Sequence, residues 1–96
     1  MRGFLSFIVL RLIREKPLSG EELRKELEKR KGSKPSPGTI YPVLKTLHEN
    51  GWIEEIKTKT KEKRYRITSR GRKEIEIATR KFIATFCDMK EEFKRA

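Results

Sequence analysis

Lysine and arginine side chains are concentrated in one segment of this 96-residue chain. Residues 57–73 contain nine basic residues and one acidic residue, Glu62, so nine minus one gives +8 of the formal net charge of +11. Residues 74–96, by contrast, hold five basic and five acidic residues. A basic stripe of this density predicts contact with a polyanion such as a nucleic acid. The alternative is a solvated face on a basic protein.

A second group of polar side chains falls on a helix predicted to begin after Ser36. Its apolar residues recur at i, i+3, i+4 and i+7, which predicts one buried stripe. The members of that stripe are Ile40, Val43, Leu44 and Leu47. The outward face then carries small or hydrogen-bonding groups, which suit close approach to phosphates and base edges. The candidate DNA contacts on this helix are Ser36, Gly38, Thr39, Tyr41, Pro42, Lys45 and Thr46. Tyr41 has the alternative of a ring packed between helices, and Lys45 that of a solvated lysine.

Two short strands are predicted on either side of a basic loop. The segments 52–56 and 63–67 both contain apolar and charged residues. In the second segment, Tyr65 and Ile67 alternate with arginines, as expected for a half-buried strand. The connection at 57–62 is polar and lacks an Asn-Gly or Asp-Gly turn, so a longer loop is expected. The candidate DNA contacts on this hairpin are Lys59, Lys61, Lys63, Arg64 and Arg66.

Two further helices are predicted before these elements. Residues 3–15 are apolar around almost the whole helix circumference, so this helix needs a second surface besides its own core, such as another subunit. After Pro17, the spacing of Ser19 and Glu22 is that of a capping box, and Gly32 ends the second helix. Ser36 is the predicted cap of the third helix.

The last helix is predicted to run from a Thr68 cap to about residue 93. A helix of that length is long for so small a domain, and its far end would expose aromatic side chains. This favours dimerisation through the helix over the alternative that it folds back on its own subunit. The predicted interface residues are Phe4, Ile8, Ile75, Phe82, Phe86, Met89 and Phe93.

The predicted fold class is therefore mainly α with a small β-hairpin: a winged helix-turn-helix followed by a long carboxy-terminal dimerisation helix. Residues 1–74 are expected to form the DNA-binding domain, whose first helix is shared with the dimer interface, and residues 68–96 the dimerisation helix. In this arrangement the third helix enters the major groove of DNA, and the hairpin reaches the backbone or the minor groove.

Catalytic chemistry is not indicated by the sequence. His48 is the only histidine, expected on a solvated helix flank. Cys87 is the only cysteine, expected in a small buried apolar role, with a redox switch across the dimer interface as the alternative. No Gly-rich phosphate loop or metal-spaced Cys/His cluster is present, so no enzyme activity, cofactor or metal site is expected. The apolar run at 4–13 is interrupted by Arg11 and too short to span a bilayer, and the single cysteine suits the cytoplasm. The lack of glutamine and the single asparagine resemble the composition of a thermophile's protein.

Several motifs closely resemble the PadR-like family of transcriptional regulators. The matching residues are Gly38-Thr39-Ile40-Tyr41-Pro42-Val43-Leu44 with Leu47, then Gly51-Trp52-Ile53, then Arg64-Tyr65-Arg66-Ile67-Thr68 with Gly71. The resemblance covers about residues 3–90. Two features depart from the family pattern. The second helix usually opens Gly-Tyr-Glu-Leu, where this chain has Gly20-Glu21-Glu22-Leu23. The carboxy-terminal region is a single helix, as in the shorter members of the family.

The resemblance implies a homodimer, built from the first and last helices, that represses transcription at a two-fold symmetric operator in double-stranded DNA. It also implies release of the DNA when a small, often aromatic, effector is bound. Phe4, Trp52, Phe82 and Phe86 are candidates for lining such a site between the subunits, with core packing as the alternative. The second function class is a nonspecific nucleic-acid-binding or protein-interaction winged helix without effector sensing. Preference for a symmetric duplex would separate the two classes.

Overall fold

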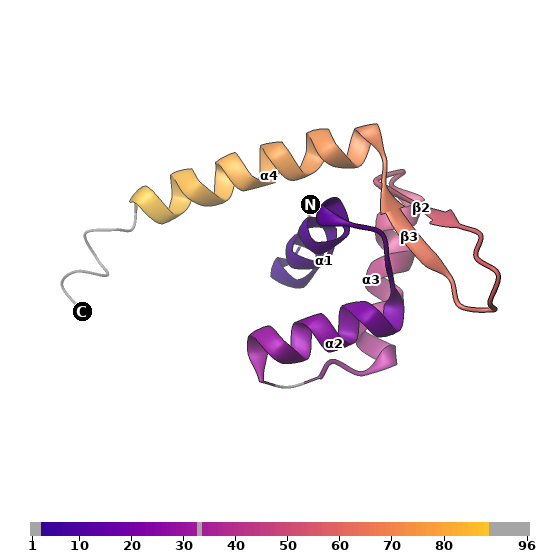
Figure 1. Cartoon of the computed structure of the whole chain (residues 1–96). Helices are drawn as coiled ribbons and strands as arrows, with labels where there is room; N and C mark the ends of the chain where they lie inside the picture. Colours follow the sequence, from indigo (N-terminus) through magenta and orange to yellow (C-terminus); the bar gives the residue numbers. More distant parts are fainter. Residues whose placement is uncertain (1–2, 33, 89–96) are drawn as a thin grey trace.

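The computed structural model describes residues 3–32 and 34–88. In this part of the chain four helices and three short strands follow one another (Figure 1). The elements are α1 (Phe4–Glu15), β1 (Leu18–Ser19), α2 (Gly20–Lys31), α3 (Pro37–Glu49), β2 (Ile53–Ile56), β3 (Arg64–Ile67) and α4 (Ser69–Asp88). The mainly helical fold with a β-hairpin is confirmed, and β1 is an additional element.

The sheet has three antiparallel strands in the order β1-β3-β2. Leu18 of β1 pairs with Tyr65 of β3, and Ile53 of β2 pairs with Ile67. The prediction of a two-stranded hairpin was therefore incomplete. Both residues of β1 are buried, so this strand shows no alternation of buried and exposed residues that could reveal it in the sequence.

The core lies between α1, the inner faces of the other helices, and the sheet. α1 contacts α3, β3 and α4, which accounts for much of its apolar circumference. Among the described residues, the hydrophobic side chains with at most 1% exposure are Val9, Leu10, Ile13, Leu23, Leu27, Ile40, Leu44, Leu47 and Ile75. In the described residues, no helix combines the length and the hydropathy that crossing a lipid bilayer requires.

Helix ends follow the predicted signals. The Ser19 hydroxyl accepts a hydrogen bond from the Glu22 backbone N–H, and the Glu22 carboxylate accepts one from the Ser19 N–H, so the capping box is confirmed. Gly32 ends α2 with a φ of 78°. Ser36 occupies the predicted N-cap position of α3, although its side chain makes no capping hydrogen bond. Its hydroxyl instead lies 3.1 Å from the Thr39 hydroxyl.

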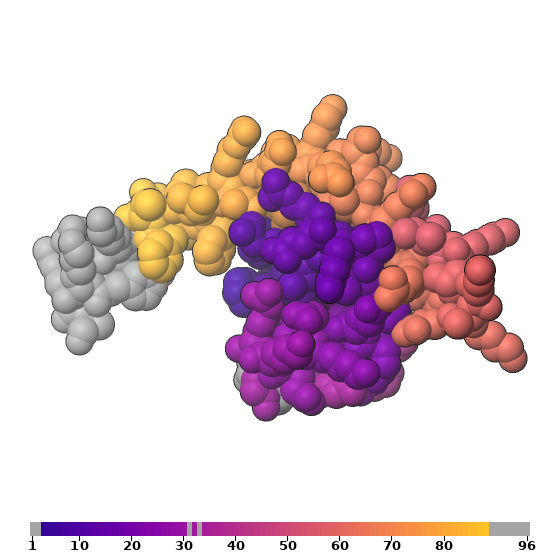
Figure 2. All heavy atoms as spheres, viewed as in Figure 1, coloured from indigo at the N-terminus to yellow at the C-terminus, as the bar shows by residue number. Residues whose placement is uncertain are grey.

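α4 is joined to the rest of the fold at its first turn. The Thr68 hydroxyl accepts a hydrogen bond from the Gly71 N–H and donates one to the Gly51 carbonyl, which lies just after α3. Beyond this turn the helix packs on α1, and its far end extends past the body of the molecule (Figures 1 and 2). The predicted end near residue 93, with Met89 and Phe93, lies outside the described residues.

Candidate nucleic-acid interface

Side chains of α2 hold the turn that leads into α3. The Arg24 Nε donates a hydrogen bond of 2.7 Å to the Pro35 carbonyl. The Glu21 carboxylate accepts a hydrogen bond from Arg24 and lies 3.2 Å from the Lys34 Nζ. Hydrogen bonds from Arg24 and Lys34 lower the pKa of Glu21, so its charge persists at neutral pH. These contacts fix the turn that precedes α3 and thereby the position of the first residues of α3.

The outward face of α3 is open to solvent from its first residue onward. Ile40, Leu44 and Leu47 are buried as predicted, and Val43 packs at the edge of the core. Inside the helix, the Thr46 hydroxyl donates a hydrogen bond to the backbone carbonyl of Pro42. All seven candidate contacts predicted for this segment are exposed: Ser36, Gly38, Thr39, Tyr41, Pro42, Lys45 and Thr46. Their contact with DNA stays a prediction.

Tyr41 combines a packed ring with an accessible edge. A Cβ atom placed on Gly20 would lie 2.9 Å from the Tyr41 ring and hydroxyl, so the ring rests directly on the glycine backbone. The side chain is nevertheless 47% exposed. The structure thus supports the alternative of a ring packed between helices without removing Tyr41 from the accessible surface. Only glycine at position 20 leaves room for this arrangement.

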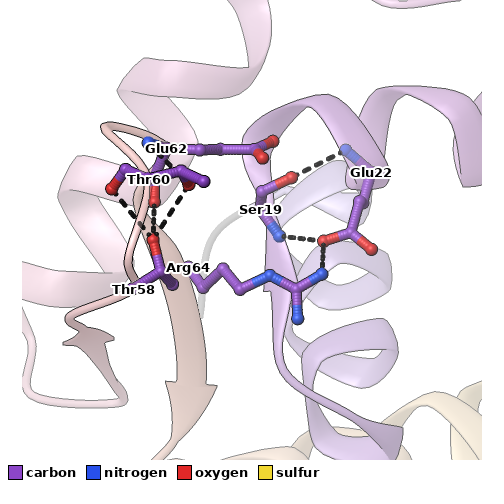
Figure 3. Close-up of polar contacts among 6 residues, drawn as sticks. All are labelled: Ser19, Glu22, Thr58, Thr60, Glu62 and Arg64. Carbon is purple, nitrogen blue, oxygen red and sulfur yellow. Dashed lines mark hydrogen bonds and ion pairs between the residues drawn. The ribbon is translucent and has the colours of Figure 1, made fainter.

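The hairpin of β2 and β3 ends in a loop folded by threonines. The Thr58 hydroxyl lies 2.8 Å from the Glu62 carbonyl and 3.0 Å from the Thr60 carbonyl, and the Thr60 hydroxyl accepts from the Glu62 N–H (Figure 3). These bonds close the loop locally. In the space-filling view the hairpin protrudes from the body at the end opposite the far part of α4 (Figure 2). The exposed lysines at this tip are Lys57, Lys59, Lys61 and Lys63.

The two arginines of β3 form ion pairs within the chain. Arg66 Nε donates to Glu54, its cross-strand neighbour in β2, at 2.5 Å. Arg64 donates across to Glu22 of α2, also at 2.5 Å. Both arginines were predicted as DNA contacts. The structure places them on the stem of the hairpin, whereas the predicted Lys59, Lys61 and Lys63 lie toward its tip.

Two adjoining hollows separate α3 from the hairpin. One, of about 340 Å³, lies between Gly20 and Tyr41 on one side and Lys61, Lys63 and Tyr65 on the other. The second, of about 180 Å³, is lined by residues of α3, β2 and the hairpin: Tyr41, Leu44, Lys45, His48, Glu55, Lys63 and Tyr65. Basic groups of α3 and of the hairpin therefore share one side of the molecule.

Sequence reasoning missed three residues of this surface. His48 was expected to be only a solvated flank residue, and it lines the second hollow. Gly20 was interpreted only as the start of a helix, but the absence of a side chain at this position also leaves room for the Tyr41 ring. Glu22 was recognised as a cap, but its ion pair with Arg64 joins residues 42 positions apart, and no local signal reports such a contact.

An aromatic face lies on the other side of the fold, between α1 and α4. The ring centroids of Phe4 and Phe82 are 6.3 Å apart, and those of Phe7 and Phe82 are 5.7 Å apart. Beside them is a hollow of about 330 Å³, lined by Gly3, Phe4, Phe7, Glu74, Ile77, Ala78, Lys81 and Phe82. Trp52 packs against the core, and neither Trp52 nor Phe86 is among the residues that line this hollow within one chain.

One predicted interface residue needs correction. Ile75 is 0% exposed within a single chain, so it can offer no surface to a second subunit. It belongs to the core because it faces inward from the part of α4 that packs on the body. Phe4, Phe82 and Phe86 remain about half exposed, at 57%, 49% and 54%, and Ile8 is partly buried against the core.

Over residues 9–77 the chain matches the transcriptional regulator PadR-like family. None of the curated proteins matches it. A transcriptional regulator from Clostridium thermocellum is similar in structure, with 25% identity, 94% of this chain and 90% of that chain covered, and a TM-score of 0.83.

Two other solved structures share the fold at lower identity. A PadR family transcription regulator from Clostridium difficile has 19% identity, coverage of 95% of this chain and 99% of that chain, and a TM-score of 0.82. RosR of H. salinarum has 21% identity, coverage of 98% and 88%, and a TM-score of 0.79. The predicted winged helix fold is thereby confirmed. Since the family match spans more than two thirds of the sequence, the chain belongs to the PadR-like family of transcriptional regulators.

Proposed function

We propose that the protein is a homodimeric, sequence-specific repressor that binds two-fold symmetric operators in double-stranded DNA. The observation that carries this proposal is the shared surface of α3 and the hairpin. Tyr41 and Lys45 of α3 line the same hollow as Lys63 of the hairpin. One duplex can therefore meet both elements at once. Such a regulator acts where the operator lies, which we take to be the cytoplasm.

Each element has a distinct role in this proposal. The exposed face of α3 enters the major groove, where Thr39, Lys45 and Thr46 meet base edges and phosphates. Gly38 and Pro42 add little bulk to this face, which favours close approach of the helix backbone. The hairpin lies on the neighbouring phosphate backbone, because lysines recognise phosphates by charge rather than by sequence. The remaining charge of the stripe attracts DNA over a longer range.

Dimerisation is assigned to the aromatic face between α1 and α4. Phe82, Ile83 and Phe86 on α4 and Phe4 on α1 are 49–57% exposed. Contiguous apolar surface of this kind marks an interaction site rather than an ordinary surface. A two-fold interface through α4 would set two copies of α3 at a fixed separation, as binding to successive turns of the major groove requires.

Relief of repression is assigned to the hollow beside Phe4, Phe7 and Phe82. Its volume of about 330 Å³ suits a small molecule, and its stacked rings suit an aromatic ligand. Lys81 and Glu74 supply polar groups at its lining. Because this hollow adjoins the proposed dimer interface, a bound ligand would change the relative orientation of the two subunits and of their α3 helices.

Selection from a random duplex library tests the DNA-binding part. We expect enrichment of symmetric sites whose half-sites are about 34 Å apart or a multiple of that spacing. Enrichment of single half-sites would contradict the homodimer. Absence of any enriched sequence, with binding retained, would instead support a nonspecific nucleic-acid-binding module. A protein that binds no duplex at low salt would direct attention to a protein partner.

The effector part is tested on a preformed complex of protein and selected duplex. Anilinonaphthalene sulfonate serves as an aromatic probe, and we expect it to lower the DNA affinity of the native protein. Phe82→Ala should lose this response, because the substitution removes one wall of the hollow. A response of equal size in both proteins would show that the probe acts elsewhere.

A further inference from the structure

Glu22 joins the start of α2 to the hairpin through a single oxygen atom. Its Oε1 accepts a hydrogen bond from the Ser19 N–H at 3.1 Å and another from Arg64 at 2.5 Å. The first bond caps α2, and the second reaches β3 (Figure 3). Helix start and hairpin stem are therefore held by the same carboxylate.

The position of Arg64 along the chain makes this contact consequential. Arg64 is the first residue of β3 and pairs with Ser19 of β1 in the strand register. Directly before it comes the loop with its lysines, from Lys57 to Lys63. Figure 3 shows the Arg64 side chain extending from the strand toward Glu22, with the threonine-closed loop beside it. Because the loop extends outward from Arg64, a small rotation of the stem there would displace the lysines of the loop by a larger distance.

Open space separates the loop from the helices at this point. A hollow of about 340 Å³ lies between Gly20 and Tyr41 on one side and Lys61 and Lys63 on the other. Tyr65 and Ile67 anchor the stem of the hairpin in the core. Since apolar packing does not fill the space on the side of the loop, the β1–β3 pairing and the ion pair hold that end of the hairpin. Removing the ion pair should widen the range of angles that the hairpin adopts.

We propose that Glu22 is a positioning residue for the hairpin, and that Arg64 acts through this ion pair as a strut rather than as a contact to DNA. This inference rests on the proposed function, because its consequence for DNA requires that the hairpin contacts the duplex. It revises the expectation that Arg64 binds a phosphate. An arginine already engaged by a carboxylate must give up that bond before it can bind a phosphate.

The charge of Glu22 is maintained under the conditions where DNA is bound. Partial burial favours the neutral acid, but the hydrogen bond from the Ser19 backbone and the charge of Arg64 outweigh it. The pKa of Glu22 is therefore lowered from its ordinary value. At neutral pH the carboxylate remains available to hold the arginine.

The Glu22→Gln variant tests this proposal, because the proposal and simple electrostatics predict opposite changes in DNA affinity. Glutamine retains the capping position, so α2 should stay intact. Removal of an acidic residue near DNA ordinarily strengthens binding, because it reduces repulsion of phosphates. The strut predicts the opposite: an affinity for the selected duplex weaker by about three- to fivefold, the size expected for a partly exposed ion pair. Equal or tighter binding would overturn the proposal.

Glu62→Gln is the matched control. Glu62 lies in the loop, where its backbone N–H and carbonyl take part in the hydrogen bonds with Thr60 and Thr58. Its substitution removes the same charge and leaves the Arg64 contact intact. We expect binding tighter by about twofold, in the direction that electrostatics alone dictates. Weakening by both substitutions alike would also contradict a specific role of Glu22.

Arg64→Gln and the double variant separate a strut from a phosphate contact. For a strut, the single variants and the double variant weaken binding by about the same factor, since each breaks the same pair. The slope of log affinity against log salt concentration then stays unchanged. For a phosphate contact, Arg64→Gln would reduce the slope by about 0.9, because one phosphate would no longer be neutralised. Such a reduction, or additive effects in the double variant, would overturn the strut.

A measurement on the free protein tests the positioning role of Glu22 independently of whether the protein binds DNA. The ¹⁵N relaxation of loop residues 57–63 should show lower order parameters in Glu22→Gln than in the native protein, with the core residues unchanged. A native protein that fails to bind duplex would contradict the proposed function and leave this comparison intact. Unchanged loop order parameters in Glu22→Gln would contradict the positioning role itself.

Discussion

Gly71, in the first turn of α4, lies against the backbone carbonyl of Trp52. A Cβ atom placed at position 71 would be 2.0 Å from that oxygen and 2.7 Å from the Ile67 side chain. The same carbonyl accepts a hydrogen bond of 3.0 Å from the Thr68 N–H. The close approach of α4 to the connection between α3 and β2 thus depends on the absence of a side chain at this position.

Replacement of Gly71 by alanine should destabilise the fold. Backbone atoms cannot move aside as a flexible side chain can, so we expect a loss of about 2–3 kcal/mol in the free energy of unfolding. Alanine would otherwise favour a helix by about 1 kcal/mol over glycine. Gly38→Ala is the control, because its Cβ would meet only the Ser36 hydroxyl oxygen, at 3.8 Å. Urea unfolding of both variants checks this; equal stability would contradict the close approach.

The hydroxyl and the ring of Tyr41 should have separable effects. Tyr41→Phe keeps the ring on Gly20, so we expect nearly native stability and DNA binding weaker by about 1 kcal/mol if the hydroxyl bonds a phosphate. Gly20→Ala should displace the ring, with losses of both stability and affinity. Thermal unfolding and DNA titration distinguish the two. Native affinity in Tyr41→Phe would assign this residue to packing alone.

Neutralising the loop lysines should weaken binding to every sequence alike. The variant combines Lys59→Ala, Lys61→Ala and Lys63→Ala, all at exposed positions. Because lysines that neutralise phosphates release counterions, the salt slope should fall by about 0.9 for each phosphate that is no longer neutralised. Titrations of operator and scrambled duplex at several salt concentrations measure this. Unchanged affinity would show that the hairpin does not act as a DNA-binding wing.

A charge on the aromatic face should separate the subunits. Phe86→Asp places a carboxylate on an apolar surface, and we expect a monomer with much weaker DNA binding, since burial of an unpaired charge is unfavourable. Arg80→Asp is the control and should stay dimeric: it also introduces an acid, but Arg80 lies on the opposite side of α4 from Phe82. Light scattering gives the mass of each variant. A dimeric Phe86→Asp protein would place the interface elsewhere.

Acid should weaken the fold partly through Glu22. Its pKa is lowered from 4.5, so the folded state binds the proton less readily than the unfolded state. The resulting stability is complete above the ordinary pKa and is lost as the pH falls below about 4.5 through the lowered value. Denaturant midpoints between pH 6 and pH 3 should therefore fall less in Glu22→Gln than in the native protein. Parallel curves would contradict this contribution.

Local signals predicted the helices and the hairpin because each depends on neighbouring residues. The capping box of Ser19 and Glu22 spans three positions, and the alternation at Tyr65 and Ile67 lies within one strand. The buried stripe of α3 follows from helical spacing alone. The outward face of α3 and the exposed loop lysines could be predicted for the same reason.

Contacts between distant residues could not be predicted in this way. The ion pair of Arg64 with Glu22 and the seat of Tyr41 on Gly20 depend on how elements pack in space. Ile75 lies seven residues before Phe82, on the same side of α4, yet Ile75 is buried in the core and Phe82 is half exposed. Periodicity identifies the apolar side of a helix but does not tell whether it faces the same chain or another one.

The most direct test of the central proposal is binding to the duplex upstream of the protein's own gene, compared with a scrambled duplex of equal length. Both are titrated at several salt concentrations, and the mass of the complex gives the stoichiometry. The proposal predicts tighter binding to the native duplex, two protomers per site and a steep salt slope. Equal binding to both duplexes, or one protomer per site, would contradict a dimeric, sequence-specific regulator of its own operator.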